Sequence, residues 1–204
     1  TELAMRILSA EGKISMGRLK KGDLDTEGWT NLATLQGRID SAPLFIDDSP
    51  NMTLMEIRAK CRRLKQRNDL KLVVLDYLQL MSSGKKVESR QQEVSEFSRS
   101  LKLLAKELDV PVIALSQLNR GSEQRTDKRP MVSDLRESGS IEQDADMVIL
   151  LHREDMYNPD SERVGEADMI IAKHRGGPTR TIPLAFSGKY SRFNNMANEA
   201  PPQY

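Results

Sequence analysis

The sequence predicts an α/β fold in which a mostly parallel β-sheet is flanked by helices and an antiparallel hairpin is added near the C-terminus. Three apolar segments of strand length, 72–75, 112–115 and 147–151, alternate with amphipathic helical patterns, an order typical of parallel sheets. Each segment is apolar at successive positions, which indicates strands covered on both faces. A glycine-rich turn at 176–178 between two further apolar segments predicts the hairpin.

The first 40 residues are expected to be helical, because apolar residues recur at steps of three and four. The members of this stripe are Trp29, Leu32, Leu35 and Ile39. A short apolar run at 43–46 follows and is consistent with a strand. Thr53 and Glu56 form a capping box, and helical spacing continues from there to Leu64.

The most regular helical pattern lies at 90–108, where apolar residues are spaced by three and four and Pro111 follows the helix. The remaining predicted elements are polar loops at 82–89 and 119–133 and hairpin strands at 167–172 and 181–186. A single domain is expected at 1–193, with a flexible tail at 194–204 that is rich in Asn and Pro.

Composition excludes several classes of protein. The chain has 31 lysines and arginines and 30 aspartates and glutamates, which gives a net charge of +1. Any binding of nucleic acid must therefore come from local loops. The single cysteine, Cys61, excludes an internal disulfide and fits a reducing compartment. No apolar run approaches the length of about 20 residues that spans a bilayer. A cytoplasmic protein without a membrane partner is expected.

Polar residues follow the predicted strands at positions where α/β proteins bind ligands, beyond the carboxyl ends of the strands. These residues are Asp47, Asp76 and Gln117. An acid at such a position is how nucleotide hydrolases hold Mg²⁺ beside phosphates, and a glutamine can orient water or contact a γ-phosphate. Each residue by itself also fits an ordinary turn or strand end.

Two further groups of residues are candidates for binding phosphates. Lys173 and Arg175 stand at alternate positions near the hairpin turn, so both point to one side and can stabilise phosphoryl charge. Arg136, Glu137 and Gly139 lie in a predicted loop whose cation and backbone N–H groups suit nucleic-acid phosphates. The alternatives are a solvated hairpin tip and an ordinary connection between two elements.

Two familiar kinds of site are not encoded. The phosphate-binding pattern G-x-x-x-x-G-K-[ST] needs a Gly-Lys pair followed by Ser or Thr, and the residues that follow the three such pairs are Ile14, Lys86 and Tyr190. His152 and His174 have no spacing to Cys61 that predicts a metal site.

Taken together, the motifs resemble the C-terminal, RecA-like motor domain of the replicative DnaB-family helicases, actinobacterial members in particular. Residues 72–81 (LVVLDYLQLM) resemble the Walker B strand, and 116–120 (SQLNR) resemble the sensor strand. Residues 127–130 (DKRP) with 134–146 (DLRESGSIEQDAD) resemble the motif leading into the DNA-binding loop, and 172–179 (AKHRGGPT) resemble the hairpin that reaches the neighbouring subunit. The resemblance favours Asp76 over Asp47 as the metal-binding acid.

The resemblance implies a function for each group of residues. Asp76 would hold Mg²⁺, and Gln117 would couple the γ-phosphate of ATP to the DNA loop. Lys173 and Arg175 would act on the ATP of the neighbouring subunit, and the DNA-binding residues would be Arg136, Glu137 and Gly139. The implied protein is a homo-hexameric ATPase that moves 5′ to 3′ on single-stranded DNA at replication forks, with a primase and a helicase loader as partners.

The chain departs from the family pattern in one large respect. In the family, the Walker A loop and the glutamate that activates water precede the position that matches Thr1, and Tyr77 rather than Glu follows Asp76. The expectation is a motor domain truncated at its N-terminus and inactive by itself. A RecA-like module that only docks DNA or partners is the main alternative, and a recombinase- or clock-type ATPase is a third.

Overall fold

The computed structural model describes residues 2–50, 52–81 and 90–196. The helices are α1 (Glu2–Gly12), α2 (Met16–Lys21), α3 (Thr26–Asp40), α4 (Leu54–Asn68), α5 (Arg90–Leu108), α6 (Gly121–Gln124) and α7 (Gly139–Asp144), with short 3₁₀ helices η1 (Leu78–Leu80), η2 (Val132–Ser138), η3 (Glu154–Met156) and η4 (Gly188–Tyr190). The strands are β1 (Val73–Leu75), β2 (Val112–Ala114), β3 (Met147–His152), β4 (Glu166–His174), β5 (Arg180–Ser187) and β6 (Arg192–Asn195).

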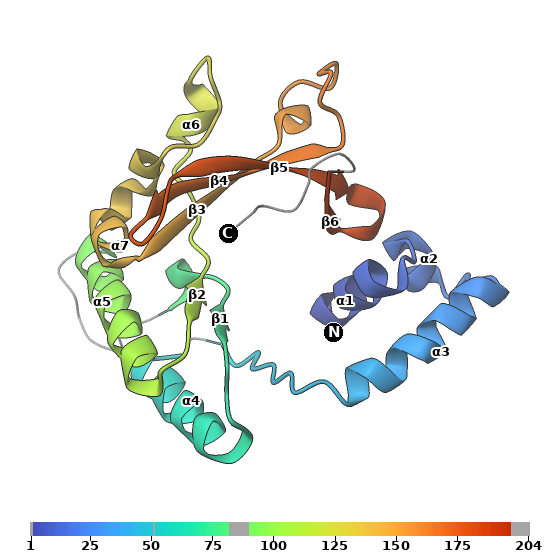
Figure 1. Cartoon of the computed structure of the whole chain (residues 1–204), viewed down its shortest axis with the longest axis horizontal. Coiled ribbons are helices and arrows are strands. Elements are labelled where there is room, and N and C mark those ends of the chain that lie inside the picture. The colour runs from blue at the N-terminus through green and yellow to red at the C-terminus, as the bar shows by residue number, and fades with distance from the viewer. Residues whose placement is uncertain (1, 51, 82–89, 197–204) are drawn as a thin grey trace. The chain divides into compact units, whose positions relative to one another are not determined.

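The predicted fold class is confirmed: strands and helices alternate, one strand pair is parallel, and the C-terminal strands form an antiparallel addition (Figure 1). The strands fall into two sheets. One is the parallel pair β1–β2, with Val73 opposite Val112 and Leu75 opposite Ala114. The other has the order β3-β4-β5-β6.

The contacts divide the described chain into two compact units. One comprises the described parts of 46–150 and 170–180, and the other those of 1–45, 151–169 and 181–204. All the candidate site residues named above belong to the first unit. In the part of the chain that the structure describes, no helix is long and apolar enough to cross a membrane.

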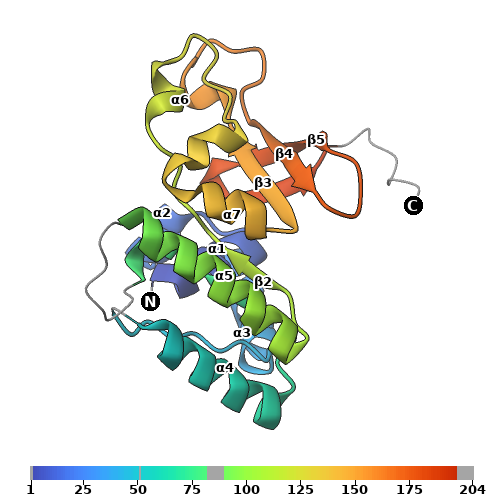
Figure 2. The same ribbon diagram turned by 90° about the vertical axis from the view of Figure 1, so that its left-hand side faces the viewer.

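The core of the first unit lies between α5, α4 and one face of the β1–β2 pair. Its centre is Phe97 and Leu78, which are 0% and 2% exposed, and apolar residues of α5 and α4 surround them. Helix α5 begins and ends as its sequence pattern predicts, and α7 lies beside it (Figure 2). The other residues buried in this core are Ile57, Cys61, Val73, Met81, Leu101, Leu104, Leu108 and Val110.

The prediction that the parallel strands are covered on both faces is wrong for this chain. Val74 and Ile113, which are paired across the two strands, are 56% and 52% exposed. Leu72 and Leu115, which are 45% and 42% exposed, extend the same apolar surface. Within this unit the apolar side chains of this face are therefore exposed.

The predicted strand at 43–46 is also wrong. These residues have no regular structure, and Leu44, Phe45 and Ile46 are about half exposed. A strand requires a hydrogen-bonded neighbour, and among the described residues none pairs with this segment.

Three further predictions were incomplete. The N-terminal helical region is broken into three helices, where Lys13 and Gly22 adopt positive φ, and Trp29 of the predicted stripe is 55% exposed. The polar loop at 119–133 contains α6, and the segment expected to be a tail begins inside β6, which pairs with β5. The predicted loop 82–89 and the residues from 197 onward lie outside the described residues.

The second unit is held together by buried polar contacts as well as apolar ones. Ser9 is fully buried and donates its hydroxyl hydrogen to the carbonyl oxygen of Ile14 at 2.6 Å. Arg192 donates to the carbonyl oxygen of Ala10 at 2.7 Å, which fixes the end of the antiparallel sheet to α1 within this unit.

Candidate nucleotide and nucleic-acid site

Asp76 and Gln117 lie at the same edge of the parallel β1–β2 sheet. Both follow the carboxyl ends of their strands, and both are exposed. The two strands stay in register past their ends, since the amide of Leu115 donates to the carbonyl oxygen of Leu75 and the amide of Leu78 donates to that of Leu115, each at 2.9 Å. The fold therefore brings together two residues that are 41 positions apart in the sequence.

Gln79 links the two strand ends and was missed by the sequence reasoning. Its side-chain amide donates to the hydroxyl oxygen of Ser116 at 3.1 Å and to the carbonyl oxygen of Gln117 at 3.3 Å. Its carbonyl oxygen accepts the backbone N–H of Gln117 at 3.3 Å. The available signal was a polar residue within the apolar run that follows Asp76. Through these bonds the position of Gln117 depends on the segment that carries Asp76.

Asp47, the other candidate acid, is engaged elsewhere. It forms an ion pair with Lys60 and accepts the backbone N–H of Ser49. The hydrogen bond from Lys60, followed by those from Ser49, lowers the pKa of Asp47 to about 2. This carboxylate is thus a local structural group of the irregular segment before α4, in agreement with the preference for Asp76.

Asp76 would meet Mg²⁺ as a single carboxylate. Among the described residues, no group of three or more His, Cys, Asp or Glu side chains is close enough to hold a metal ion. Mg²⁺ in nucleotide sites takes one or two carboxylates and completes its shell with water and phosphate oxygens. Asp76 is an exposed carboxylate at the strand end, and its role as a ligand of Mg²⁺ stays a prediction.

The predicted DNA loop is helical. Arg136 and Glu137 belong to η2, and Gly139 begins α7 with φ −52°, a conformation open to any residue. A Cβ atom at Gly139 would meet nothing within 4 Å in the described structure. The backbone freedom of glycine is therefore not needed here, and what Gly139 provides is open space beside the backbone.

A buried ion pair fixes the start of η2. Both carboxylate oxygens of Asp134, which is 4% exposed, accept hydrogen bonds from the Arg125 guanidinium at 2.8 Å. The amide of Met131 also donates to this carboxylate at 2.8 Å. The hydrogen bond from Arg125 is the main cause of a lowered pKa at Asp134.

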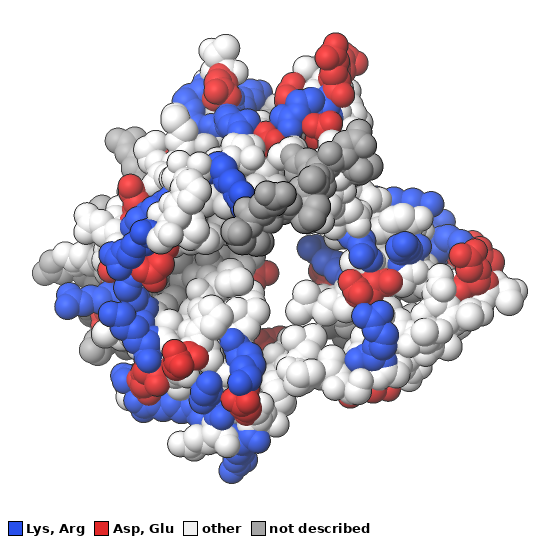
Figure 3. Space-filling model, viewed as in Figure 1, with Lys and Arg blue, Asp and Glu red and all other residues white. Residues whose placement is uncertain are grey.

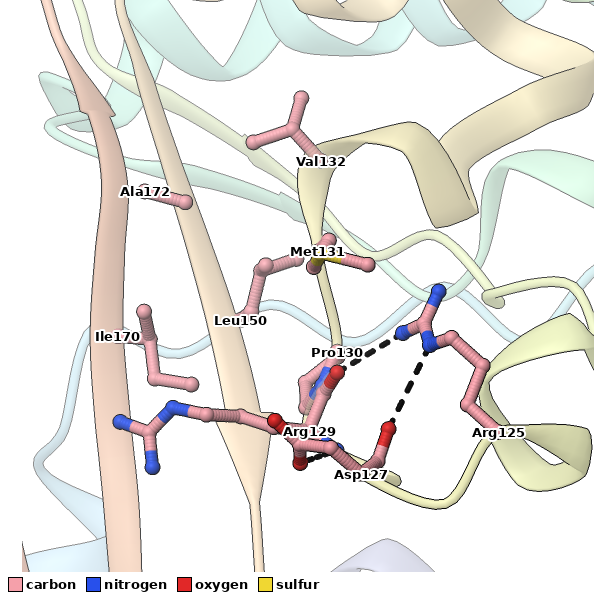
Figure 4. A pocket seen from close by; sticks show the side chains of 9 residues that line it. All are labelled: Arg125, Asp127, Arg129, Pro130, Met131, Val132, Leu150, Ile170 and Ala172. Carbon is pink, nitrogen blue, oxygen red and sulfur yellow. Dashed lines mark hydrogen bonds between the residues drawn. The ribbon is translucent and has the colours of Figure 1, made fainter.

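Arg125 also forms a hydrogen bond within the segment that precedes η2. Its guanidinium donates to the carbonyl oxygen of Arg129 at 2.8 Å, as Figure 4 shows. Together with apolar residues of β3 and β4, this segment lines an open hollow of about 500 Å³. The lining residues are Arg125, Asp127, Arg129, Pro130, Met131, Val132, Leu150, Ile170 and Ala172.

The sensor strand and η2 are in direct contact. The backbone N–H of Asn119 donates to the carbonyl oxygen of Asp134 at 3.0 Å. Leu118 packs in the small apolar cluster that contains Leu135. Asn119 lies two residues after Gln117, and Asp134 lies two residues before Arg136, so this hydrogen bond joins the segments that carry the two predicted sites.

Lys173 contacts the end of α7, and Arg175 contacts Asp146, which lies two residues after α7. Lys173 donates to the carbonyl oxygens of Glu142 and, at 3.5 Å, Gln143. Arg175 forms an ion pair with Asp146 at 3.2 Å. Both cations therefore meet a segment that directly follows the predicted DNA-binding residues.

The hairpin turn depends on Gly177. A Cβ atom at this position would lie 2.6 Å from two atoms of the His174 ring, closer than packed atoms approach. His174 stands between the two cations in the sequence, so a side chain at position 177 would displace the His174 ring.

Charge is distributed in small groups over the surface. Lys and Arg side chains are interspersed with Asp and Glu on the face seen in Figure 3, in keeping with the net charge of +1. The part of this face that is drawn in colour therefore shows no large patch of a single charge.

The parallel strand pair with an acid and a glutamine at adjacent strand ends, together with the antiparallel C-terminal strands, is typical of a RecA-like α/β fold. Residues 1–195 match the model of the family described as DnaB-like helicase C terminal domain. The chain belongs to this family.

Relatives and solved structures agree with this assignment. The chain is 70% identical over 197 residues to the replicative DNA helicase DnaB of Leifsonia xyli subsp. xyli and 56% identical over 196 residues to that of Geobacillus stearothermophilus. The two matches include 97% and 96% of this chain and 43% of the length of each relative. The chain therefore spans less than half the length of these curated relatives.

Two solved structures have the same fold. One, described as an ATPase domain, superposes with a TM-score of 0.89 at 44% identity, covering 94% of this chain and 69% of that one. The other, a DnaB-like replicative helicase described with its interactions with primase, gives a TM-score of 0.92 at 43% identity, covering 96% of this chain and 48% of that one.

Proposed function

We propose that the chain is the later part of the ATP-driven motor domain of a replicative DNA helicase. The complete polypeptide would form a homo-hexameric ring that moves 5′ to 3′ along single-stranded DNA at cytoplasmic replication forks. Family membership and the names of the relatives support this proposal. A primase partner is supported by the solved helicase described with primase, and a helicase loader is proposed from the resemblance.

The chemistry is assigned to the two strand ends and the hairpin. Asp76 would hold Mg²⁺, which supplies neutralisation of phosphate charge when it is bound. Gln117 would contact the γ-phosphate, and Lys173 with Arg175 would stabilise charge on the nucleotide of the neighbouring subunit. Arg136, with the backbone near Gly139, would hold the phosphodiester chain without reading sequence.

A preceding segment of the polypeptide would supply the phosphate-binding loop and the residue that activates water. This chain covers 69% of the solved ATPase domain, and its β1–β2 sheet exposes an apolar face that includes Val74 and Ile113. Parallel sheets are normally covered on both faces. The remaining part of the motor domain is therefore proposed to pack on this face.

The observation that carries the proposal is the 3.0 Å hydrogen bond from the amide of Asn119 to the carbonyl oxygen of Asp134. It connects the strand end that carries Gln117, which is proposed to contact the γ-phosphate, with the segment proposed to bind DNA. A movement of Gln117 on hydrolysis would be transmitted to η2 through this bond. A motor requires such coupling between the nucleotide site and the DNA-binding segment, whereas a simple binding domain does not.

The test is DNA-stimulated ATP hydrolysis by the chain joined to its preceding segment. We expect hydrolysis that rises on addition of single-stranded DNA. When Arg175→Ala subunits are mixed into wild-type rings, each should impair hydrolysis at the site of a neighbouring subunit. ATP turnover should therefore fall more steeply than in proportion to the fraction of mutant subunits. Proportional dilution would contradict action on the neighbouring subunit.

A docking module without hydrolysis is the second candidate. It is favoured by one feature of the sequence, the lack of a G-x-x-x-x-G-K-[ST] pattern in the 204 residues. No hydrolysis in any assembled form, together with retained binding of DNA, would favour this candidate over the motor.

A further inference from the structure

One carboxylate, Asp146, connects the cationic hairpin to the long helix α5. Its Oδ1 atom lies 3.2 Å from Nη1 of Arg175 and 2.8 Å from Nζ of Lys102. The backbone adds a third contact, because the amide of Arg175 donates to the carbonyl oxygen of Asp146 at 2.8 Å. The end of β4 is thereby fixed beside the start of β3.

Lys102 holds the Asp146 carboxylate from the side of α5. Its side chain is 22% exposed, and its ammonium also donates to the carbonyl oxygen of Asp144 at 2.7 Å. The hydrogen bond from Lys102, and then the charges of Lys102, Arg175 and Lys173, lower the pKa of Asp146. The carboxylate is therefore ionised at neutral pH, and it is fixed from the side of α5.

Arg175 is held at one nitrogen and still faces solvent. Its side chain is 63% exposed, and a guanidinium carries five N–H donors in a planar fork. The contact at Nη1 favours one orientation of the fork and leaves its outer donors able to bind a phosphate. Fixing the donor before the reaction is what makes such a group effective, because little reorganisation is then needed.

The same segment joins the hairpin to the proposed DNA site. Helix α7 follows η2 without a break, and Ile141 of α7 packs against the core that contains α5. At its C-terminal end, α7 offers the carbonyl oxygens of Glu142 and Gln143 to Lys173, a favourable place for a cation. A shift of α7 would change the surroundings of both Lys173 and Arg175.

We propose that Asp146 is a positioning residue for Arg175, and that through Asp146 the cation acting on the neighbouring nucleotide is coupled to the DNA-binding segment. The inference rests on the proposed function and adds to it a residue with no contact to nucleotide or DNA of its own. Lys102 contributes to the same positioning, because it holds Asp146 from α5.

The test compares Asp146→Asn, Asp146→Glu and the control Glu123→Gln in the complete polypeptide. Glu123→Gln removes one exposed carboxylate from α6, a residue with no role in the proposed sites. For Asp146→Asn we expect kcat for ATP in the presence of DNA to fall about 10-fold to 100-fold with little change in KM, the scale of a misplaced catalytic group. Asp146→Glu should recover part of this loss, and the control should match wild type.

A double-mutant cycle separates positioning from a structural effect. If Asp146 acts through Arg175, Asp146→Asn should cost nothing further in an Arg175→Ala background. Additive losses, or a wild-type kcat for Asp146→Asn, would overturn the inference. If Asp146→Asn lowers the urea midpoint, Lys102→Met takes its place and should show the same non-additivity.

Failure of the inference is distinct from failure of the proposed function. If wild type shows no DNA-stimulated hydrolysis, the motor assignment fails and the inference fails with it. If wild type is active and Arg175→Ala is impaired while Asp146→Asn is not, only the positioning role is refuted.

Discussion

Replacing Asp134 by asparagine tests whether the anchor of η2 controls the binding of a DNA strand. The substitution removes the charge that accepts two 2.8 Å hydrogen bonds from Arg125 while keeping the shape of the side chain. Hydrogen bonds to charged groups contribute about 1.5–3 kcal/mol. Because the Arg125 side chain is 30% exposed and asparagine keeps one acceptor, we expect a loss of about 2 kcal/mol in the free energy of unfolding.

The assays are urea denaturation and the affinity for a single-stranded oligonucleotide, measured in the complete polypeptide. The matched control is Asp168→Asn, since Asp168 is 3% exposed and accepts two hydrogen bonds from Arg163 in the other unit. Both variants should lose similar stability, and only Asp134→Asn should bind DNA more weakly. Equal affinities of the two variants would refute the idea that this ion pair positions the DNA segment.

The same ion pair predicts the acid sensitivity of η2. Arg125 lowers the pKa of Asp134 in the folded chain, so its contribution is complete above the unfolded carboxyl pKa of about 3.9 and is lost as the pH falls through the lower folded value. The urea midpoint of wild type should therefore fall more than that of Asp134→Asn between about pH 6 and pH 3. Parallel pH profiles would contradict this assignment.

Three further substitutions test the remaining contacts. Arg136→Ala should weaken single-strand binding equally across sequences and lower its salt slope by about 1; an unchanged slope argues against a phosphate contact. Gly139→Ala, for which the chain leaves open space, should keep the urea midpoint but weaken DNA binding if a phosphate approaches this backbone, whereas the equally open Gly37→Ala should bind normally. Gly177→Ala should reduce ATP turnover because the new methyl group displaces the His174 ring; normal turnover would show that the hairpin tolerates this movement.

The sequence by itself determined those features that depend on local chemistry. The spacing of apolar residues predicted α5 from its first to its last residue, and Thr53 with Glu56 predicted the capping box that the structure contains. The order of the motifs predicted the fold class and the family, because several weak patterns in a fixed order are specific where each by itself is not. Periodicity and capping act within a few residues, so they are readable from the chain alone.

Only the tertiary structure decided which distant residues meet. Asp47 and Asp76 have similar local sequences, and it is the contact with Lys60 that separates their surroundings. The bonds of Gln79 to the sensor strand and of Asp146 to both Lys102 and Arg175 join residues 29 to 44 positions apart. Such contacts follow from the pairing of β1 with β2 and from the packing of α5 against α7, and no local pattern in the sequence encodes either.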